Sequence, residues 1–317
     1  MLLIIKHFYL SLLTSLHFSK NRSFFRQFIK FFLIFYIKFF CAFNFFRNNK
    51  KKNFFINPIL IKRENLFINE IELEKIIEKL DSSGFYEKVF LHKEIVKKIL
   101  NTVTKKNLLF FSKGKDDNFL NFLEALNESD NLESIKDKGL ENKISHIASF
   151  IKLNECQIIV ELIKSNLFLN VAKNYIGFDN LEVTAECYIS NPFLISENQK
   201  KDNAQYYHYD LDYKRFLKIF IYLTDVTEES GPHIFIEGTH KKKKINHILS
   251  QRISDIEIAE NYDEKLKKII LGEKGKIIFE DTFGLHKGMN PKNKSRIMIV
   301  IQYGKGLGIN KSHQIYV

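Results

Sequence analysis

Cysteine is scarce in this chain of 317 residues, and its scarcity excludes several classes of protein. The three cysteines are Cys41, Cys156 and Cys187, and neither their odd number nor their wide spacing fits a disulfide framework or a zinc site. We expect reduced, buried thiols, as in a cytoplasmic protein. The chain also lacks an internal repeat at solenoid spacing. It shows no regular βαβ alternation, which argues against a doubly wound parallel sheet.

Acidic residues are missing from the first part of the chain. The first 63 residues contain 12 Lys or Arg and no Asp or Glu, so the remainder balances at 37 basic and 37 acidic side chains. The net charge of +12 therefore belongs to one terminal segment, and the body of the protein gives no indication of nucleic-acid binding. A hydrophobic content of 45% indicates a globular protein.

The basic segment is rich in phenylalanine, with 15 of the 31 Phe residues in positions 1–56. Charges interrupt its apolar runs before about 20 residues, so a transmembrane span is not expected, and no small-residue cleavage site supports an export signal. Two interpretations stay open: residues 1–52 make peripheral contact with an anionic membrane surface, or the segment extends from or packs on the next domain. We therefore expect an N-terminal extension at 1–60 and a single catalytic domain at 61–317, in the cytoplasm or at the membrane surface.

The region 61–177 has mainly helical periodicity. One helix is predicted where apolar residues follow i, i+3, i+4, i+7 spacing, at Leu73, Ile76, Ile77 and Leu80. Gly84 lies just beyond this helix and supplies a stop. Other helices are predicted around 95–100, at 119–126 and at 146–175, the last broken near Asn166 and stopped by Gly177.

After Gly177 the pattern changes to short strands separated by turn residues. Strands are predicted at 181–190, 205–212, 216–223, 233–237, 276–279 and 297–303, with a helical insertion at 249–271. Helices first and strands after predict an α+β fold with a β-sandwich or barrel at its centre. We expect helical support at 61–177, a strand core at 178–304 and a C-terminal tail at 305–317.

Three residues of the strand region form a pattern suited to a metal ion. His208 and Asp210 stand two apart in a predicted strand, so their side chains share one face. A lone His-x-Asp pair arises easily by chance, but His286 follows after the strand 276–279 and a turn. Two histidines and one carboxylate that occupy one face of a metal ion, and leave three of its coordination positions open, form the facial triad of non-haem iron(II) oxygenases. A bidentate cosubstrate and O2 need those open positions.

Arg296 stands ten residues after His286 and opens a strand that is otherwise apolar. An unpaired buried charge is costly, so this arginine should have a partner. The planar guanidinium binds carboxylates in bidentate fashion, and the distal carboxylate of 2-oxoglutarate is the partner we expect. Taken alone, the residue also fits a strand edge in solvent.

Several further side chains have two interpretations. His233 and His240 are weaker alternatives as metal ligands, and Asp212 has the strand parity to replace the first carboxylate. The run Lys241 to Lys244 either binds an anionic substrate or is a solvated charged surface, and we favour the second. Lys218 enters an apolar strand and either pairs with a carboxylate or touches substrate.

Five motifs agree with one protein family in type, order and spacing. They are His208-Tyr209-Asp210, residues 216–226, Glu229-Ser230-Gly231-Pro232-His233, Glu237-Gly238-Thr239-His240-Lys241, and His286-Lys287-Gly288 with Arg296. On these motifs, over about residues 180–304, the sequence resembles the phytanoyl-CoA dioxygenase-like oxygenases. The fourth motif departs from the Pro-Gly-Ser-His that members often have.

The resemblance implies a double-stranded β-helix, or jelly roll, and a reaction that converts 2-oxoglutarate and O2 to succinate and CO2. It implies that His208, Asp210 and His286 are catalytic ligands of Fe(II) and that Arg296 binds 2-oxoglutarate. Halogenating enzymes that resemble this family lack the carboxylate ligand, so Asp210 indicates hydroxylation of a small organic substrate. The best-known substrate, a branched acyl-CoA, does not carry over, because a fold does not choose a substrate. The alternatives are a non-catalytic jelly-roll binding protein, which the complete triad disfavours, and a membrane-surface scaffold built on residues 1–52.

Overall fold

Two antiparallel β-sheets of unequal size and a set of helices make up the described part of the protein. The computed structural model describes residues 66–68, 72–105, 109–111, 146–151, 156–192, 205–212, 215–250, 252–305 and 315–317. The N-terminal extension 1–60 and the helix expected at 119–126 lie outside them. Within them, no helix is long and apolar enough to cross a membrane. The mixture of helices and antiparallel sheet confirms the α+β prediction.

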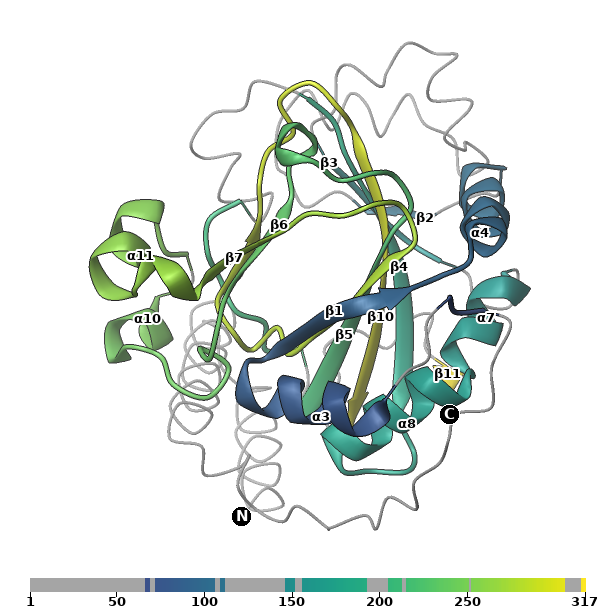
Figure 1. Cartoon of the computed structure of the whole chain (residues 1–317), viewed down its shortest axis with the longest axis horizontal. Coiled ribbons are helices and arrows are strands. Elements are labelled where there is room, and N and C mark those ends of the chain that lie inside the picture. The colour runs from purple at the N-terminus through teal and green to yellow at the C-terminus, as the bar shows by residue number, and fades with distance from the viewer. Residues whose placement is uncertain are drawn as a thin grey trace, which may run out of the picture.

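The larger sheet has eight strands in the order β1-β8-β5-β10-β4-β3-β2, and β11 also pairs with β4. Its strands are β1 (Phe85–Phe90), β2 (Leu109–Phe111), β3 (His146–Phe150), β4 (Glu182–Ser190), β5 (Arg215–Tyr222), β8 (Lys276–Glu280), β10 (Arg296–Lys305) and β11 (Ile315–Tyr316). The smaller sheet has the order β7-β6-β9 and consists of β7 (Lys267–Ile270), β6 (His233–Ile236) and β9 (His286–Gly288). Figure 1 shows β7 and β6 across from β5, β10 and β4.

The two faces of the larger sheet have different neighbours. Alternate side chains of a strand point to opposite faces, and β10 pairs along its length with β4 on one side and β5 on the other. On the outer face, Ile219 and Ile221 are fully buried in the main core with the helices. On the inner face, Phe220 packs in a second apolar cluster with Phe235 of the smaller sheet. Apolar side chains of the two sheets therefore pack against each other.

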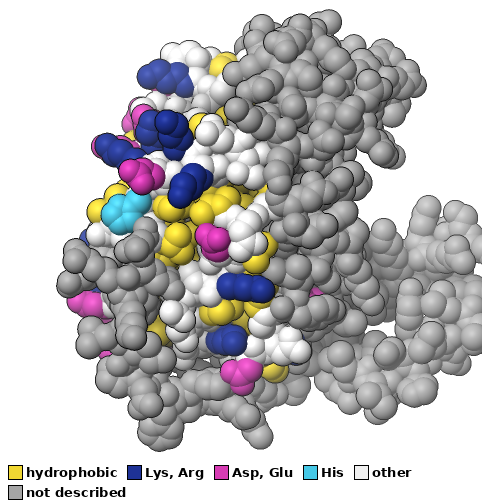
Figure 2. Space-filling view, turned by 90° about the vertical axis from the view of Figure 1, so that its right-hand side faces the viewer, with side chains coloured by type: hydrophobic (Ala, Val, Ile, Leu, Met, Phe, Trp, Pro, Cys, Tyr) yellow, Lys and Arg dark blue, Asp and Glu magenta, His cyan; other side chains and the backbone are white. Residues whose placement is uncertain are grey.

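Helices cover the outer face of the larger sheet and one side of the smaller sheet. The first group is α3 (Leu73–Ser82), α4 (Lys93–Lys105), α7 (Gln157–Ile163) and α8 (Asn166–Ile176). The second consists of α10 (Ile245–Leu249) and α11 (Asp255–Asn261), and two 3-10 turns lie at Glu228–Ser230 and Glu264–Leu266. Figure 2 views the side on which α4 and α7 lie, where basic and acidic side chains alternate with apolar ones. The described part of that side therefore carries no surface of one sign.

Local sequence explains where two of these helices end. α3 buries the predicted apolar stripe and stops before Gly84, whose φ of 93° and close approach to His240 leave no room for a Cβ. α8 begins after Ser165, whose side chain accepts a hydrogen bond from the backbone N–H of Phe168. A cap of this kind contributes about 1 kcal/mol. α8 ends at Gly177, with φ at 82°, so both predicted glycine stops are confirmed.

The strands expected at 181–190, 216–223, 233–237, 276–279 and 297–303 are confirmed as β4, β5, β6, β8 and β10. The helix predicted at 146–175 is wrong in its first part, because residues 146–150 form β3. Their backbone pairs with β4 from His146↔Ser190 to Phe150↔Glu186. Hydrogen bonding to a distant strand here outweighs the local helical periodicity. The region 61–177 thus supplies β1, β2 and β3 as well as helices, while the domain boundaries stay a prediction.

Two more predicted elements are corrected. Among its described residues, the helical insertion predicted at 249–271 is helical at Leu249, which ends α10, at α11 and at the 3-10 turn. Residues 267–270 instead pair with β6 as strand β7. The strand predicted at 205–212 is an extended segment that makes isolated bridges at Tyr207 and His208. Its backbone reaches a partner at only a few points, so strand parity alone does not fix its side chains.

Candidate metal centre

An isolated β-bridge brings His208 and His286 together. The backbone N–H of each residue donates to the carbonyl of the other, with N···O distances of 3.0 and 2.9 Å. The two imidazole rings lie side by side with their centroids 4.3 Å apart. Residues far apart in the sequence are thus fixed as neighbours by the backbone itself, before any ligand binds.

The hydrogen bonds of the two rings leave the same nitrogen free on each. Nδ1 of His208 lies 3.0 Å from the carbonyl of Tyr206, and Nδ1 of His286 lies 3.0 Å from the carbonyl of Gly284. A carbonyl only accepts, so Nδ1 carries the proton and Nε2 keeps its lone pair. Burial is the main cause that lowers the pKa of both histidines, which keeps the rings neutral. Two neutral imidazoles with free Nε2 atoms are suited to a metal ion.

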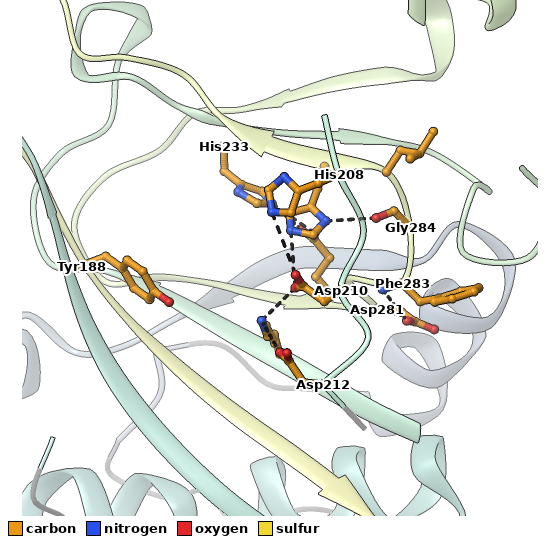
Figure 3. Close-up of polar contacts among 12 residues, drawn as sticks. Tyr188, His208, Asp210, Asp212, His233, Asp281, Phe283 and Gly284 are labelled. Carbon is orange, nitrogen blue, oxygen red and sulfur yellow. Dashed lines mark hydrogen bonds and ion pairs between the residues drawn. The ribbon is translucent and has the colours of Figure 1, made fainter. Parts of the chain in front are cut away.

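The carboxylate of Asp210 completes the group. Its Oδ1 lies 4.0 Å from Nε2 of His208, and its Oδ2 lies 3.5 Å from Nε2 of His286. One ligand atom from each of the three residues lies within 4.8 Å of the others, which makes this the metal-ligating cluster found among the described residues. Burial would raise the pKa of Asp210, but the ammonium group of Lys218 holds it well below its usual value. Figure 3 shows Asp210 below His208, and the donor set fits Fe(II).

The weaker candidate ligands have other partners. Nε2 of His233 lies 2.9 and 3.1 Å from the two carboxyl oxygens of Glu280. Burial lowers the pKa of His233 to about 3 and raises the pKa of Glu280 to about 8, which favours the neutral forms of both. Nε2 of His240 contacts the backbone carbonyl of Asp81, and Asp212 pairs with a lysine. His233, His240 and Asp212 therefore lie outside the metal-ligating cluster of His208, Asp210 and His286.

Arg296 is buried and lacks a carboxylate partner among the described residues. Its Nη1 donates to the carbonyl of Gly231, and its Nη2 lies 3.4 Å from the hydroxyl of Ser190. The Nε atom is buried without a hydrogen-bond partner. Gly288, two residues after His286, lies so close that an added Cβ would stand 3.2 Å from Nη2. An uncompensated buried guanidinium beside the metal-ligand strand is suited to an anionic ligand.

Gly231 should be sensitive to substitution because its backbone is tightly packed where its carbonyl accepts a hydrogen bond from Arg296. Its φ is 69°, and an added Cβ would stand 2.4 Å from the backbone oxygen of Met289. We expect Gly231→Ala to lower the free energy of unfolding by about 1–3 kcal/mol, as strained backbone does elsewhere. Chemical denaturation measures this change. Gly238→Ala is the control, because it has a similar φ of 78° but no atom within 4 Å of the added Cβ. Equal losses in the two variants would show that the close contact contributes nothing.

Contacts describe the surroundings of Lys218 and of the lysine run. Lys218 pairs with carboxylates, with Nζ 2.8 Å from Asp210 and 3.1 Å from Asp212. In the lysine run, Lys241 forms an exposed ion pair, whereas Lys243 is half-buried with Nζ 3.5 Å from the ring centroid of a phenylalanine. The solvated charged surface that we favour for this run stays a prediction. Glu280, the partner of His233, has only one local signal in the sequence, which is a carboxylate at the end of an apolar strand.

Comparison with known families agrees with this geometry. The family model for phytanoyl-CoA dioxygenase (PhyH) matches residues 86–290. The chain belongs to this family. Membership supports an enzyme of the iron- and 2-oxoglutarate-dependent type, and the His-Asp-His group is consistent with Fe(II) and 2-oxoglutarate as its cofactors.

Several solved structures are similar to the chain. The non-haem α-ketoglutarate-dependent epimerase SnoN from nogalamycin biosynthesis is 14% identical, covers 74% of this chain and 80% of its own, and has a TM-score of 0.49. HygX from Streptomyces hygroscopicus, with nickel and 2-oxoglutarate bound, is 10% identical over 73% and 86% of the two chains, with a TM-score of 0.48. EvdO2 from Micromonospora carbonacea var. aurantiaca, complexed with 2-oxoglutarate, is 14% identical over 78% and 96%, with a TM-score of 0.47.

One curated protein also matches in sequence. Protein TIC 214 of Physcomitrium patens is 27% identical over 233 residues, which is 67% of this chain. The chain spans only 14% of the length of that protein. The assignment to the family therefore rests on the family model, which covers the residues of the candidate metal centre.

Proposed function

We propose that this protein is an Fe(II)- and 2-oxoglutarate-dependent dioxygenase that hydroxylates a small organic substrate and releases succinate and CO2. His208, Asp210 and His286 hold the metal ion, and Arg296 binds the distal carboxylate of 2-oxoglutarate. The two facing sheets support a jelly-roll, or double-stranded β-helix, core as the scaffold of the site. The domain at 61–317 then works as one catalytic unit.

One observation carries the proposal. The Nε2 atoms of two neutral, backbone-anchored histidines converge on one carboxylate in the buried space between the sheets. A histidine pair that served only the core would be expected to have both ring nitrogens satisfied by protein. The alternative of a non-catalytic binding protein does not explain why three ligand atoms are left facing one another.

Each residue has a distinct task in this proposal. Bound Fe(II) supplies the activation of O2 coupled to decarboxylation of 2-oxoglutarate. The bridge between His208 and His286 fixes two ligands before the metal arrives, and Arg296 orients the cosubstrate through a charge-assisted contact.

A coupled assay tests the function. The chain loaded with Fe(II) should convert 2-oxoglutarate to succinate faster when the correct substrate is present, so a substrate panel is screened for stimulated succinate release. Asp210→Asn is the matched variant, because it keeps the size of the side chain and removes the charge. Succinate release that the variant retains in full would contradict the proposed metal centre.

The fate of O2 distinguishes hydroxylation from other outcomes. Asp210 occupies the position that halogenating relatives leave open, so oxygen rather than halide should enter the substrate. Under ¹⁸O2 in chloride-containing buffer, we expect one labelled atom in the product and one in succinate, measured by mass spectrometry. A chlorinated product would refute the role of Asp210. An unlabelled product with labelled succinate would indicate another reaction, such as epimerisation.

A further inference from the structure

Lys218 contributes a cationic side chain to the inner face of β5. Its neighbours along the strand, Leu217 and Ile219, are fully buried on the outer face, so the lysine points between the sheets. Across the sheet it stands in register with Glu280 on β8 and with Gln302 on β10. This polar row lies next to the apolar row of Phe220, at the end of the sheet where the metal centre is found. The position therefore brings a charge to the candidate ligands.

The ammonium group of Lys218 forms ion pairs with two carboxylates. Nζ of Lys218 lies 2.8 Å from Oδ2 of Asp210 and 3.1 Å from Oδ2 of Asp212. The side chains of Lys218 and Asp210 are only 14% and 17% exposed, so solvent screens their attraction little. The ammonium group thus donates to both carboxylates, and Figure 3 shows Asp210 above Asp212.

The ion pair with Lys218 engages one of the two oxygens of Asp210. Oδ2 accepts from Lys218 and also lies 3.5 Å from Nε2 of His286, whereas Oδ1 has no contact with the lysine and lies 4.0 Å from Nε2 of His208. The χ2 torsion of an aspartate is broad and roughly two-fold, so an unheld carboxylate turns freely. Held through one oxygen, it has a defined orientation toward the two histidines. Ligating carboxylates are commonly oriented in this way by an outer partner.

We propose that Lys218 is a positioning residue that limits Asp210 to one metal-ligating oxygen, with Asp212 holding the ammonium group in place. The inference rests on the proposed function, because it concerns the open positions that 2-oxoglutarate and O2 need. Without the lysine, both oxygens of Asp210 are available to the metal ion, and one open position is lost. The loss therefore falls on cosubstrate binding more than on metal binding.

Lys218→Met in the full chain tests this assignment. The protein is loaded with Co(II), whose visible absorption depends on coordination number, and is titrated with 2-oxoglutarate by calorimetry. We expect Lys218→Met to bind Co(II), to show an altered Co(II) spectrum and to bind 2-oxoglutarate about 10- to 100-fold more weakly. The variant should lose less affinity for Co(II) than for 2-oxoglutarate. Lys218→Arg should restore part of the cosubstrate affinity because it keeps a cation there.

Lys276→Met is the matched control. Lys276 is also a lysine with a 13% exposed side chain, and it pairs with Glu87 at 2.6 Å at the opposite end of β8 from Glu280. We expect this variant to keep the Co(II) spectrum and the 2-oxoglutarate affinity of the unmodified protein. A general loss of packing would instead change both lysine variants alike, which would overturn the positioning role.

The remaining outcomes are also decisive. If Lys218→Met fails to fold, Asp212→Asn replaces it, since this variant removes one contact and should weaken 2-oxoglutarate binding in the same direction by a smaller factor. An unchanged spectrum and unchanged affinity in the soluble variant would refute the inference. An unmodified protein that binds neither Co(II) nor 2-oxoglutarate would instead refute the proposed function, so the two failures are distinguishable.

Discussion

Replacing His208 or His286 by alanine is expected to abolish Fe(II) binding. In the proposed site each histidine supplies one of three protein ligands, and its Nε2 is the atom that faces the carboxylate of Asp210. Purified without oxygen, the unmodified protein should bind about one Fe(II) per chain and then 2-oxoglutarate, with the weak visible absorption of the chelate. Both alanine variants should lose this absorption, and anaerobic titration with absorption spectroscopy measures it.

Two other histidines provide the controls. His92 is exposed, and His92→Ala should bind iron as the unmodified protein does. His233→Gln is the sharper control, since His233 is buried next to His286 but contacts Glu280 through its Nε2. We expect it to retain iron. Retained iron affinity in both ligand variants, or its loss in His233→Gln alone, would sink the assignment of the ligands.

Replacing Arg296 by leucine is expected to weaken 2-oxoglutarate binding by tens- to thousands-fold while iron stays bound. Loss of a buried charge-assisted pair costs about 2–5 kcal/mol, and each tenfold in affinity corresponds to about 1.4 kcal/mol. The free Nε atom of Arg296 and the absence of a carboxylate partner in the described part of the chain support this expectation. Isothermal titration of the iron-loaded protein measures the change.

Arg215→Leu is the control for the loss of an arginine from the same sheet. Arg215 opens β5, and its Nη1 donates to the backbone carbonyl of Ile176 at 3.0 Å. The Arg215→Leu variant should keep its affinity for 2-oxoglutarate, because Arg215 is not one of the residues proposed to bind the metal ion or the cosubstrate. An unchanged affinity in Arg296→Leu, with iron bound, would show that another cation takes the distal carboxylate.

The strands, the helix α3 and the residue types of the candidate site can be predicted from the sequence because each depends on a local pattern. β5 and β10 follow from runs of apolar and β-branched residues, and α3 follows from helical spacing that ends at a glycine. The pair His208 and Asp210 and the charge of Arg296 are likewise visible as residue types in an informative order. These signals identify the class of site without any knowledge of distances.

Pairing between distant segments was decided by the tertiary structure alone. The bridge from His208 to His286, and the carbonyls that leave both Nε2 atoms free, depend on which backbone groups meet across the sheet. For the same reason residues 146–150 became β3, since the neighbouring strand β4 supplied hydrogen bonds that no local pattern reveals. The contacts of Lys218 with Asp210, and of His233 with Glu280, likewise arise between segments that are not paired with each other and meet only when the chain has packed. Sequence spacing specifies one segment at a time, whereas hydrogen bonds and ion pairs between segments form only when the whole chain has packed.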